Sequence, residues 1–290
     1  MTRFLVTGAG GMLGHDLLAV LGGRDVTAAS RAELDITDAA KVRDLVEGHD
    51  VVLNAAAWTD VDGAESHEAA ATAVNGAAVA ALAAACAATG ARLLHVSTDY
   101  VFAGDATEPY AEDAPTAPLN AYGRSKLAGE RAVLDTLPET GYVVRTAWLY
   151  GATGKNFVRT MLRLAAERDF VEVVDDQVGQ PTWSRDLAGQ LVRLAESGAP
   201  AGVYHGTASG RTSWHGLAEA VFAEAGHDPA RVRRTTSAAY TRPAPRPSFS
   251  VLGHDRWTAA GLAPMRPWRS MLAAALADPQ FATGAEGGPR

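Results

Sequence analysis

The chain has 290 residues, 47% of them hydrophobic and 20% charged, with a formal net charge of −7. This is the composition of a globular protein with a large core, and the charge argues against nucleic acid or a membrane surface as a partner. The single cysteine, Cys86, has no partner for a disulfide or metal site, which favours a reducing compartment. The N-terminus shows no signal-peptide pattern, so we expect a cytoplasmic protein.

Short apolar runs alternate with helical patterns along the first half of the chain. The runs that predict buried parallel strands lie at 3–8, 25–30, 50–56, 92–98 and 141–147. Helical spacing follows at 11–22, 38–48, 64–89 and 121–135. The alanine-rich part of the third segment, 69–88, suits a helix packed closely on a sheet better than a membrane span. Strict alternation predicts an α/β fold with a Rossmann-type doubly wound parallel sheet.

The alternation loosens after Trp148, which predicts a second, smaller C-terminal α/β lobe. We expect the sheet domain to comprise residues 1–148, with parts of 177–202 and 235–257 returning to it. The smaller lobe would then comprise 149–176, 203–234 and 258–278. The last residues, 279–290, are expected to form a disordered tail.

Three glycines stand at the junction of the first strand and the first helix. Gly8, Gly11 and Gly14 are spaced three apart in "TGAGGMLG". Glycines there permit a tight turn and a close backbone approach, and the helix N-terminus offers free N–H groups to a pyrophosphate. The sheet domain is therefore predicted to bind a dinucleotide.

The end of the second predicted strand distinguishes between the two nicotinamide cofactors. An NAD site usually carries an acid there to hold the ribose 2′-hydroxyl. This chain has Ser30 and Arg31 instead, and a hydroxyl with a guanidinium suits a 2′-phosphate. NADPH is favoured and NADH stays possible, because Arg31 has the alternative of pointing into solvent.

A tyrosine and a lysine lie four positions apart in "AYGRSKLAGE", a predicted helix. Tyr122 and Lys126 share one helical face, so the ammonium can lie beside the phenol and lower its pKa. A phenol tuned in this way can donate a proton to a carbonyl oxygen during hydride transfer. Ser97 and Thr98 end the fourth strand, where the active-site groups of such sheets gather. The alternative is a solvated helix start with no chemistry.

These motifs together resemble the extended short-chain dehydrogenase/reductases, and finer features narrow the resemblance to one family. The segments at 54–65, 96–105, 118–130, 145–151, 156–165, 175–182 and 242–252 follow the order and spacing of the dTDP-4-dehydrorhamnose reductase family. The resemblance covers residues 2 to about 276. It implies NADPH-dependent reduction of the 4-keto group of a dTDP-4-keto-6-deoxyhexose, either dTDP-4-dehydrorhamnose or a related antibiotic deoxysugar precursor.

The resemblance also implies residue roles. Tyr122 would donate the proton, Lys126 would bind the nicotinamide ribose and lower the phenol pKa, and Thr98 would bind the sugar carbonyl. Further residues implied to line the cofactor are Met12, Leu13, Asp35, Ile36, Ala55, Ala56 and Ala57. Those implied to contact the substrate are Asp99, Trp148, Asn156, Gln177, Thr182, Arg242 and Arg246. The alternative for the two arginines is to solubilise a proline-rich loop.

Proteins that resemble this chain differ in metal binding, oligomeric state and function. Some family members carry an acidic metal site at a dimer interface, but His15 stands here after the third glycine, so no metal site and a monomer or weak homodimer are expected. A 4,6-dehydratase needs a second acid where this chain has Tyr100, and epimerases of this fold keep NAD, which Ser30 and Arg31 disfavour. A non-catalytic NADP-binding regulatory subunit is a further alternative. The sequence leaves open which 4-keto sugar is the substrate.

Overall fold

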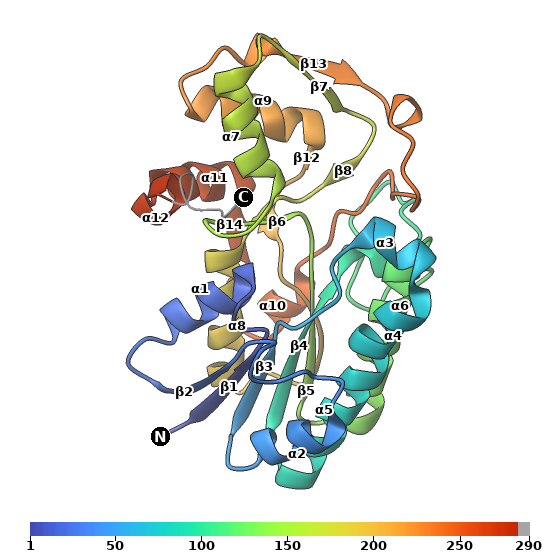
Figure 1. Cartoon of the computed structure of the whole chain (residues 1–290), viewed down its shortest axis with the longest axis vertical. Coiled ribbons are helices and arrows are strands. Elements are labelled where there is room, and N and C mark those ends of the chain that lie inside the picture. The colour runs from blue at the N-terminus through green and yellow to red at the C-terminus, as the bar shows by residue number, and fades with distance from the viewer. Residues whose placement is uncertain (284–290) are drawn as a thin grey trace.

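The computed structural model describes residues 1–283, and its centre is a six-stranded parallel sheet (Figure 1). The strand order is β10-β5-β4-β3-β1-β2. The bounds are β1 (Arg3–Thr7), β2 (Asp25–Ala29), β3 (Val51–Asn54), β4 (Arg92–Thr98), β5 (Gly141–Thr146) and β10 (Gly202–His205). Every neighbouring pair is parallel. The predicted α/β Rossmann-type sheet is confirmed.

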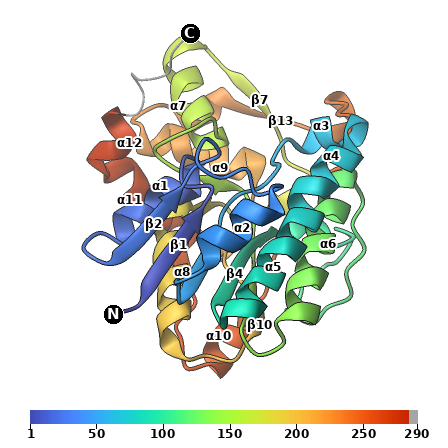
Figure 2. The ribbon, with the colours of Figure 1, turned by 60° about the horizontal axis from the view of Figure 1, so that its bottom comes forward.

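Helices cover both faces of this sheet, as Figure 2 shows. On one face α2 (Ala39–Val46), α5 (Ala78–Thr89) and α6 (Ala121–Thr136) lie side by side. On the other, α1 (Met12–Val20) packs on α8 (Ser184–Ser197). Because neighbouring strand residues point to opposite faces, Phe4 and Val6 enter one core and Leu5 enters the other.

The alanine-rich segment forms one long helical stretch over the sheet. It runs through α4 (Glu68–Thr72), a π-turn at Ala73–Ala77 and α5. Glu68–Thr89 is the one helix among residues 1–283 that is long and apolar enough to cross a membrane, and half of that stretch is buried inside the protein. Its contacts with α2 and α6 are those of a helix in a globular core.

A second group of elements lies beyond the carboxyl ends of the sheet strands (Figure 1). It contains two small strand pairs, β7 (Val171–Val174) with β13 (Val232–Thr235) and β8 (Val178–Gly179) with β12 (Thr212–Ser213). The helices α7 (Phe157–Glu167) and α9 (Trp214–Glu224) pack against each other there. The remaining short elements are α3 (Val61–Ser66), β6 (Leu149–Tyr150), β9 (Thr182–Trp183), β11 (Ala208–Ser209), α10 (Asp255–Ala259), β14 (Met265–Pro267), α11 (Trp268–Ala277) and α12 (Pro279–Thr283). Of these, α3 packs on α6 and α10 packs on β10 of the main sheet.

Two of the expected boundaries are wrong. β10 pairs with β5 as the edge strand of the main sheet, so residues 203–205 belong to the sheet domain and not to the smaller lobe. The expected tail is helical over Pro279–Thr283, because Phe281 is only 3% exposed and packs in the core. Residues 284–290 lie outside the described part of the chain. The remaining division into two lobes stays a prediction.

Candidate active site

The glycine turn leaves no room for side chains. Gly8 has a φ of 71°, and a Cβ placed on it would lie 2.6 Å from the amide nitrogen of Ala56. A Cβ on Gly14 would lie 2.2 Å from the carbonyl oxygen of Gly8. The turn therefore needs glycine at both positions, and it brings the start of α1 directly against the end of β1.

The residues predicted to line a dinucleotide surround this turn. Met12 and Leu13 are the first residues of α1. The N-cap is Gly11, so among the described residues no capping side chain accepts from the first amides of this helix. Such free N–H groups are suited to a pyrophosphate. Ala55 and Ala56 follow β3 and border Gly8, with Ala57 next in the chain. The cradle fits the dinucleotide that the sequence predicts.

The adenine side of the cradle lies at the end of β2. Ser30 lies beside the turn: a Cβ placed on Gly10 would be 3.6 Å from the Cβ of Ser30. Arg31 is exposed. Asp35 is exposed and accepts hydrogen bonds from Thr37, and Ile36 is buried, 6% exposed.

Sequence reasoning missed the acid at this position. Glu33 accepts a hydrogen bond from the Ser30 amide at 2.7 Å. The available signal was Glu33 itself, three residues after Ser30. It was missed because the acid of an NAD site is usually sought directly at the end of the strand.

Tyr122, Lys126 and Thr98 come together at the carboxyl edge of the sheet. Asn120 caps α6 by accepting from the Gly123 amide at 2.8 Å, which starts the helix just before Tyr122. Thr98 ends β4, and its side chain hydrogen-bonds with the Tyr122 phenol. Tyr122 and Thr98 are therefore in contact, whereas Lys126 has other partners.

The pKa of Tyr122 is raised, whereas the Tyr122–Lys126 spacing predicts that it is lowered. Burial raises the pKa of Tyr122 to about 12, and the Asp99 carboxylate adds to the rise, against the hydrogen bond from Thr98. The Lys126 ammonium points to the sheet instead, where it donates to the Val96 carbonyl at 2.7 Å. Burial lowers the pKa of Lys126 to about 8. Desolvation exceeds charge attraction here, and the phenol stays protonated at neutral pH.

Asp99 is the second buried acid–base group of the site. One carboxylate oxygen accepts from the Thr98 hydroxyl at 3.0 Å, and the other has no hydrogen-bond partner among residues 1–283. Burial raises the pKa of Asp99 to about 6, against the hydrogen bond from Thr98. The predicted site residue therefore lies within the network of the trio.

A buried polar chain behind Lys126 escaped the sequence analysis. The Thr7 hydroxyl donates to Asn54 at 2.7 Å, and Asn54 contacts His95 Nδ1 at 2.9 Å. His95 Nε2 lies 3.3 Å from the Lys126 ammonium. These residues come from β1, β3, β4 and α6, and no sequence spacing reveals such a contact across a sheet.

Trp148 lies at the same edge of the sheet. It comes two residues after Thr146, which pairs with Thr98 across β5 and β4. Its φ of 47° is unusual for a bulky residue, and such conformations concentrate at functional sites. Its indole stacks on Trp214 with centroids 3.7 Å apart and planes at 8°. Gln177 accepts from the Trp214 indole N–H at 3.2 Å, so this predicted residue lies behind the stack.

Two predicted substrate residues have internal roles. Thr182 is completely buried in β9, where its hydroxyl donates to the Gln180 carbonyl and accepts from the Ala208 amide, so its predicted contact with substrate is wrong in this arrangement. Asn156 is the N-cap of α7 and accepts from the Arg159 amide at 3.1 Å.

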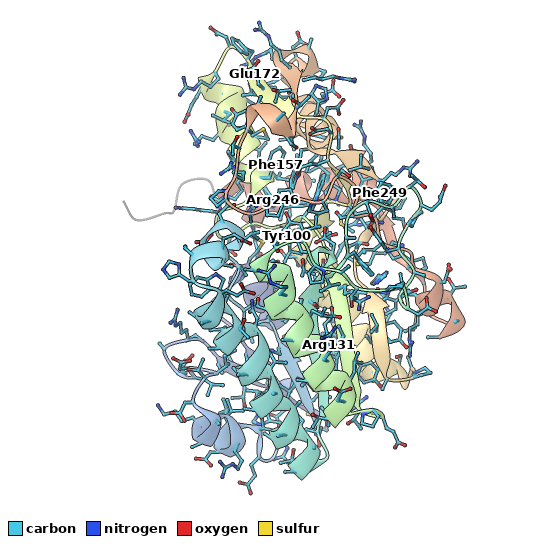
Figure 3. The ribbon with its side chains drawn as sticks, turned by 90° about the vertical axis from the view of Figure 1, so that its right-hand side faces the viewer. Tyr100, Arg131, Phe157, Glu172, Arg246 and Phe249 are labelled. Atoms are coloured by element: carbon cyan, nitrogen blue, oxygen red, sulfur yellow. The ribbon has the colours of Figure 1, made fainter. Side chains whose placement is uncertain are left out.

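The two arginines of the proline-rich loop converge on one carboxylate. Arg246 lies 2.9 Å from Asp62 of α3, and Arg242 lies 3.9 Å from it. Figure 3 shows Arg246 near Tyr100, between the sheet and the second group of elements. Arg246 is 19% exposed and Arg242 61%. The cluster ties this loop to α3 across the edge of the site.

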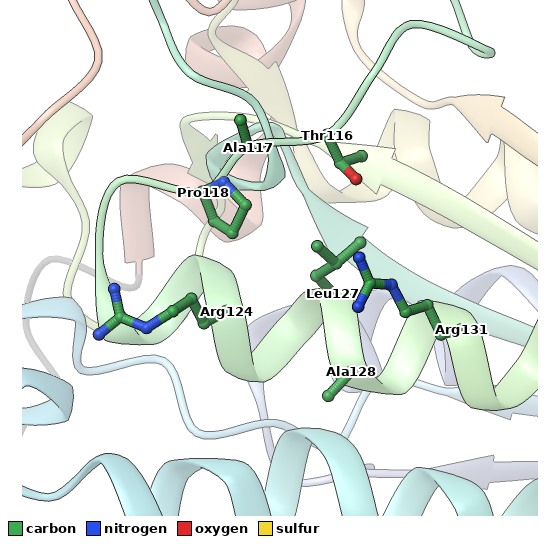
Figure 4. Close-up of a pocket in the computed structure, with 7 residues that line it drawn as sticks. All are labelled: Thr116, Ala117, Pro118, Arg124, Leu127, Ala128 and Arg131. Carbon is green, nitrogen blue, oxygen red and sulfur yellow. The ribbon is translucent and has the colours of Figure 1, made fainter.

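A hollow on the outer side of α6 is separate from these residues. It has a volume of about 470 Å³ and is lined by Thr116, Ala117, Pro118, Arg124, Leu127, Ala128 and Arg131 (Figure 4). Arg124 is held there by a bidentate ion pair with Glu68. None of the predicted site residues lines this hollow, so it does not belong to the candidate active site.

Comparisons with known proteins agree with this arrangement. The family model described as the RmlD substrate binding domain matches residues 2–281. The chain is 58% identical over 278 residues to a dTDP-4-dehydrorhamnose reductase of Streptomyces griseus, covering 93% of this chain and 91% of that protein. It is 52% identical to a dTDP-4-keto-6-deoxy-D-glucose reductase of Streptomyces niveus, with 94% and 96% covered.

A solved structure of a relative is also similar in three dimensions. The dTDP-4-dehydrorhamnose reductase of Bacillus anthracis, in complex with NADP, superposes with a TM-score of 0.92 at 35% identity and covers 96% of this chain and 99% of its own. The family match extends over nearly the whole sequence and includes both the glycine turn and the Tyr122–Lys126 helix. The chain therefore belongs to the RmlD substrate binding domain family.

Proposed function

We propose that this protein reduces the 4-keto group of a dTDP-4-keto-6-deoxyhexose with NADPH. The observation that carries the proposal is a half-buried, protonated Tyr122 bonded to Thr98 at the carboxyl edge of a sheet whose first strand ends in the glycine turn. Relatives of 58% and 52% identity carry names of reductases of dTDP-4-keto sugars, and the similar Bacillus anthracis structure holds NADP. The substrate is dTDP-4-dehydrorhamnose or a related antibiotic deoxysugar precursor.

Each of the site residues has a separate role in the reaction. NADPH, when bound, supplies the hydride that adds to the sugar C4. Tyr122 donates its phenolic proton to the oxygen that becomes the 4-hydroxyl, and Thr98 orients both the phenol and that oxygen by hydrogen bonding. Lys126 would hold the nicotinamide ribose through hydrogen bonds from its ammonium group. Arg31 and Ser30 would hold the 2′-phosphate.

The surroundings of the reaction follow from the same proposal. Trp148 offers an aromatic face to the sugar, and Arg246 and Arg242 offer charge to the nucleotide diphosphate. The protein acts in the cytoplasm on a small molecule, as a monomer or a weak homodimer. Neither a nucleic acid nor a membrane takes part.

The other readings are less well supported. Dehydration needs a second acid after Asp99, where Tyr100 stands. A regulatory subunit that does not turn over has no use for a phenol held protonated against Thr98. An epimerase would retain NAD, against the Ser30–Arg31 pair at the end of β2.

The test is to incubate the purified protein with a dTDP-4-keto-6-deoxy sugar and NADPH and to identify the product by NMR. Stoichiometric oxidation of NADPH with appearance of a 4-hydroxyl supports the reductase. A parallel incubation with dTDP-glucose tests the dehydratase, which would remove water from that sugar with no net cofactor oxidation. Cofactor binding without any turnover supports the regulatory alternative.

A further inference from the structure

We propose that the Glu33 carboxylate occupies the place of the adenosine 2′-phosphate and thereby limits the preference for NADPH over NADH. The inference rests on the proposed use of a nicotinamide cofactor. It goes beyond that use, because it makes Glu33 a specificity-determining residue that works against Arg31.

The position of Glu33 relative to the cradle supports this. The Ala9 amide donates to the Ala29 carbonyl at 3.1 Å, which fixes the end of β2 against the glycine turn. Ser30 follows at once and lies beside Gly10. A nucleotide seated on the turn has its adenosine ribose at this strand end, so the donors of Ser30 face the 2′-position.

Those donors are already bonded to an anion. The Ser30 amide donates to Glu33 Oε2 at 2.7 Å, and hydrogen bonds from the Ser30 side chain and amide hold the pKa of Glu33 below its usual value. The carboxylate is thus ionised at neutral pH and sits where donors converge. Amide and hydroxyl donors bind a carboxylate and a phosphate oxygen by the same chemistry.

Acidic residues close to Arg31 in the chain also oppose the binding of a 2′-phosphate. Arg31 is the cation expected to meet the phosphate, yet its chain neighbourhood also contains Glu33 and Asp35, and its charge acts on Asp35. A 2′-phosphate, which carries about −1.5 to −2 charges at pH 7, must displace the carboxylate from Ser30 and then remain near it. A ribose with a free 2′-hydroxyl meets no such cost and can donate to the carboxylate.

The test compares two nucleotide fragments that differ only in this phosphate, 2′,5′-ADP and 5′-AMP. Titration calorimetry gives both dissociation constants for the wild type and for Glu33→Gln, which keeps an acceptor for Ser30 and loses the charge. We expect the preference for 2′,5′-ADP to rise by about 3- to 10-fold, since one charge-assisted contact is removed at a solvent-exposed site. The affinity for 5′-AMP should stay the same or fall.

Three further variants serve as comparisons for Glu33→Gln. Glu139→Gln removes the same charge from an exposed position before β5, which is separated from β2 by three strands, and should leave the preference unchanged. Arg31→Ala should lower it. Glu33→Ala frees both Ser30 donors and tests the same point if the glutamine variant fails to fold, which thermal unfolding will show.

The outcomes separate this inference from the proposed reductase activity. An unchanged or reduced preference in folded Glu33→Gln overturns the inference, and so does a wild type that binds neither fragment. A raised preference supports it even if the keto-sugar assay shows no product. In that case the reductase proposal fails alone.

Discussion

Tyr122 and Asp99 belong to one buried hydrogen-bond network through Thr98, and burial raises the pKa of both. A phenol with a pKa of about 12 is protonated at neutral pH, so its proton is available for an oxygen that becomes an alkoxide as hydride arrives. The lowering of this pKa that the Tyr122–Lys126 spacing suggests depends on the ammonium lying at the phenol. In this arrangement it is bonded to Val96.

Replacement of the donor tests the assignment directly. Tyr122→Phe removes the phenolic proton and leaves the nucleotide cradle intact, so turnover should fall by ~10²–10⁴-fold. The dissociation constant for NADPH should change little. Tyr240→Phe, at an exposed tyrosine, is the matched control. Near-normal reduction by the Tyr122 variant would remove the residue from the mechanism.

Asp99 gives a prediction about pH and stability. Its pKa is raised from 3.8 to about 6, so the folded state holds this proton more tightly than the unfolded state. The wild type therefore loses stability as the pH rises from about 4 to about 6. One pKa unit corresponds to about 1.4 kcal/mol, which sets an upper limit of about 3 kcal/mol for the loss.

Asp99→Asn removes this titration. Urea unfolding at pH 4.5 and pH 8 should show the variant gaining stability relative to the wild type at the higher pH. If the difference between the two proteins is the same at both pH values, Asp99 does not carry a raised pKa.

At the scale of elements, the Trp148–Trp214 stack joins the end of the main sheet to α9. A Cβ on Gly179 of β8 would lie 2.5 Å from the Trp148 ring, so β8 closes the other side of the indole. The ring is thus fixed by α9 and β8, and this explains how the unusual backbone of Trp148 is maintained.

Loss of the stack should therefore weaken substrate binding more than catalysis. An aromatic pair is worth about 0.5–1.5 kcal/mol, so Trp214→Ala should raise KM for the keto sugar by roughly 2- to 12-fold. The dissociation constant for NADPH should be unaffected. Trp214→Phe keeps a ring on Trp148 and should restore most of the loss. Equal effects on both ligands would indicate general destabilisation instead.

The C-terminal helix α12 gives a stability prediction. Phe281 is 3% exposed and approaches Tyr150 edge-on, with ring centroids 6.4 Å apart. Phe281→Ala should lower the free energy of unfolding by about 3–5 kcal/mol, as for other buried aromatics. Urea unfolding measures this. A loss below about 1 kcal/mol, the size of a surface substitution, would mean that the helix is not docked in solution.

Sequence patterns predicted the central strands well because each is a short apolar run before a glycine, a helix cap or a polar turn. They failed where a tertiary contact decides the structure. The run at 203–205 is too short to stand out, and only pairing with β5 makes it a strand. Thr182 looked like a site residue by position, but the β9 backbone turns its side chain into the core. Glu33 was missed because its partner is a backbone amide.

At the scale of the whole molecule, the nucleotide-binding sheet is not a contiguous piece of chain. Residues 1–148 lack both β10 and α8, and α8 packs on α1 over one face of the sheet. A fragment 1–148 should therefore unfold without cooperativity and bind no NADPH, whereas the full chain should unfold cooperatively and bind NADPH. Calorimetry and nucleotide titration of the two proteins provide the test. A monomeric, nucleotide-binding fragment would show that the first half is an independent domain.

The sheet order has a further consequence for synthesis in the cell. The edge of β5 is open until residue 205 has left the ribosome, because β10 is its neighbour. At roughly 5–20 residues per second, translation from the end of β5 to the end of β10 takes several seconds to about ten seconds. During that interval one edge of β5 in the nascent chain is unpaired, and an open strand edge is a template for association with other chains. Chaperone dependence of the newly made protein should thus be concentrated in this interval of translation and end once β10 emerges.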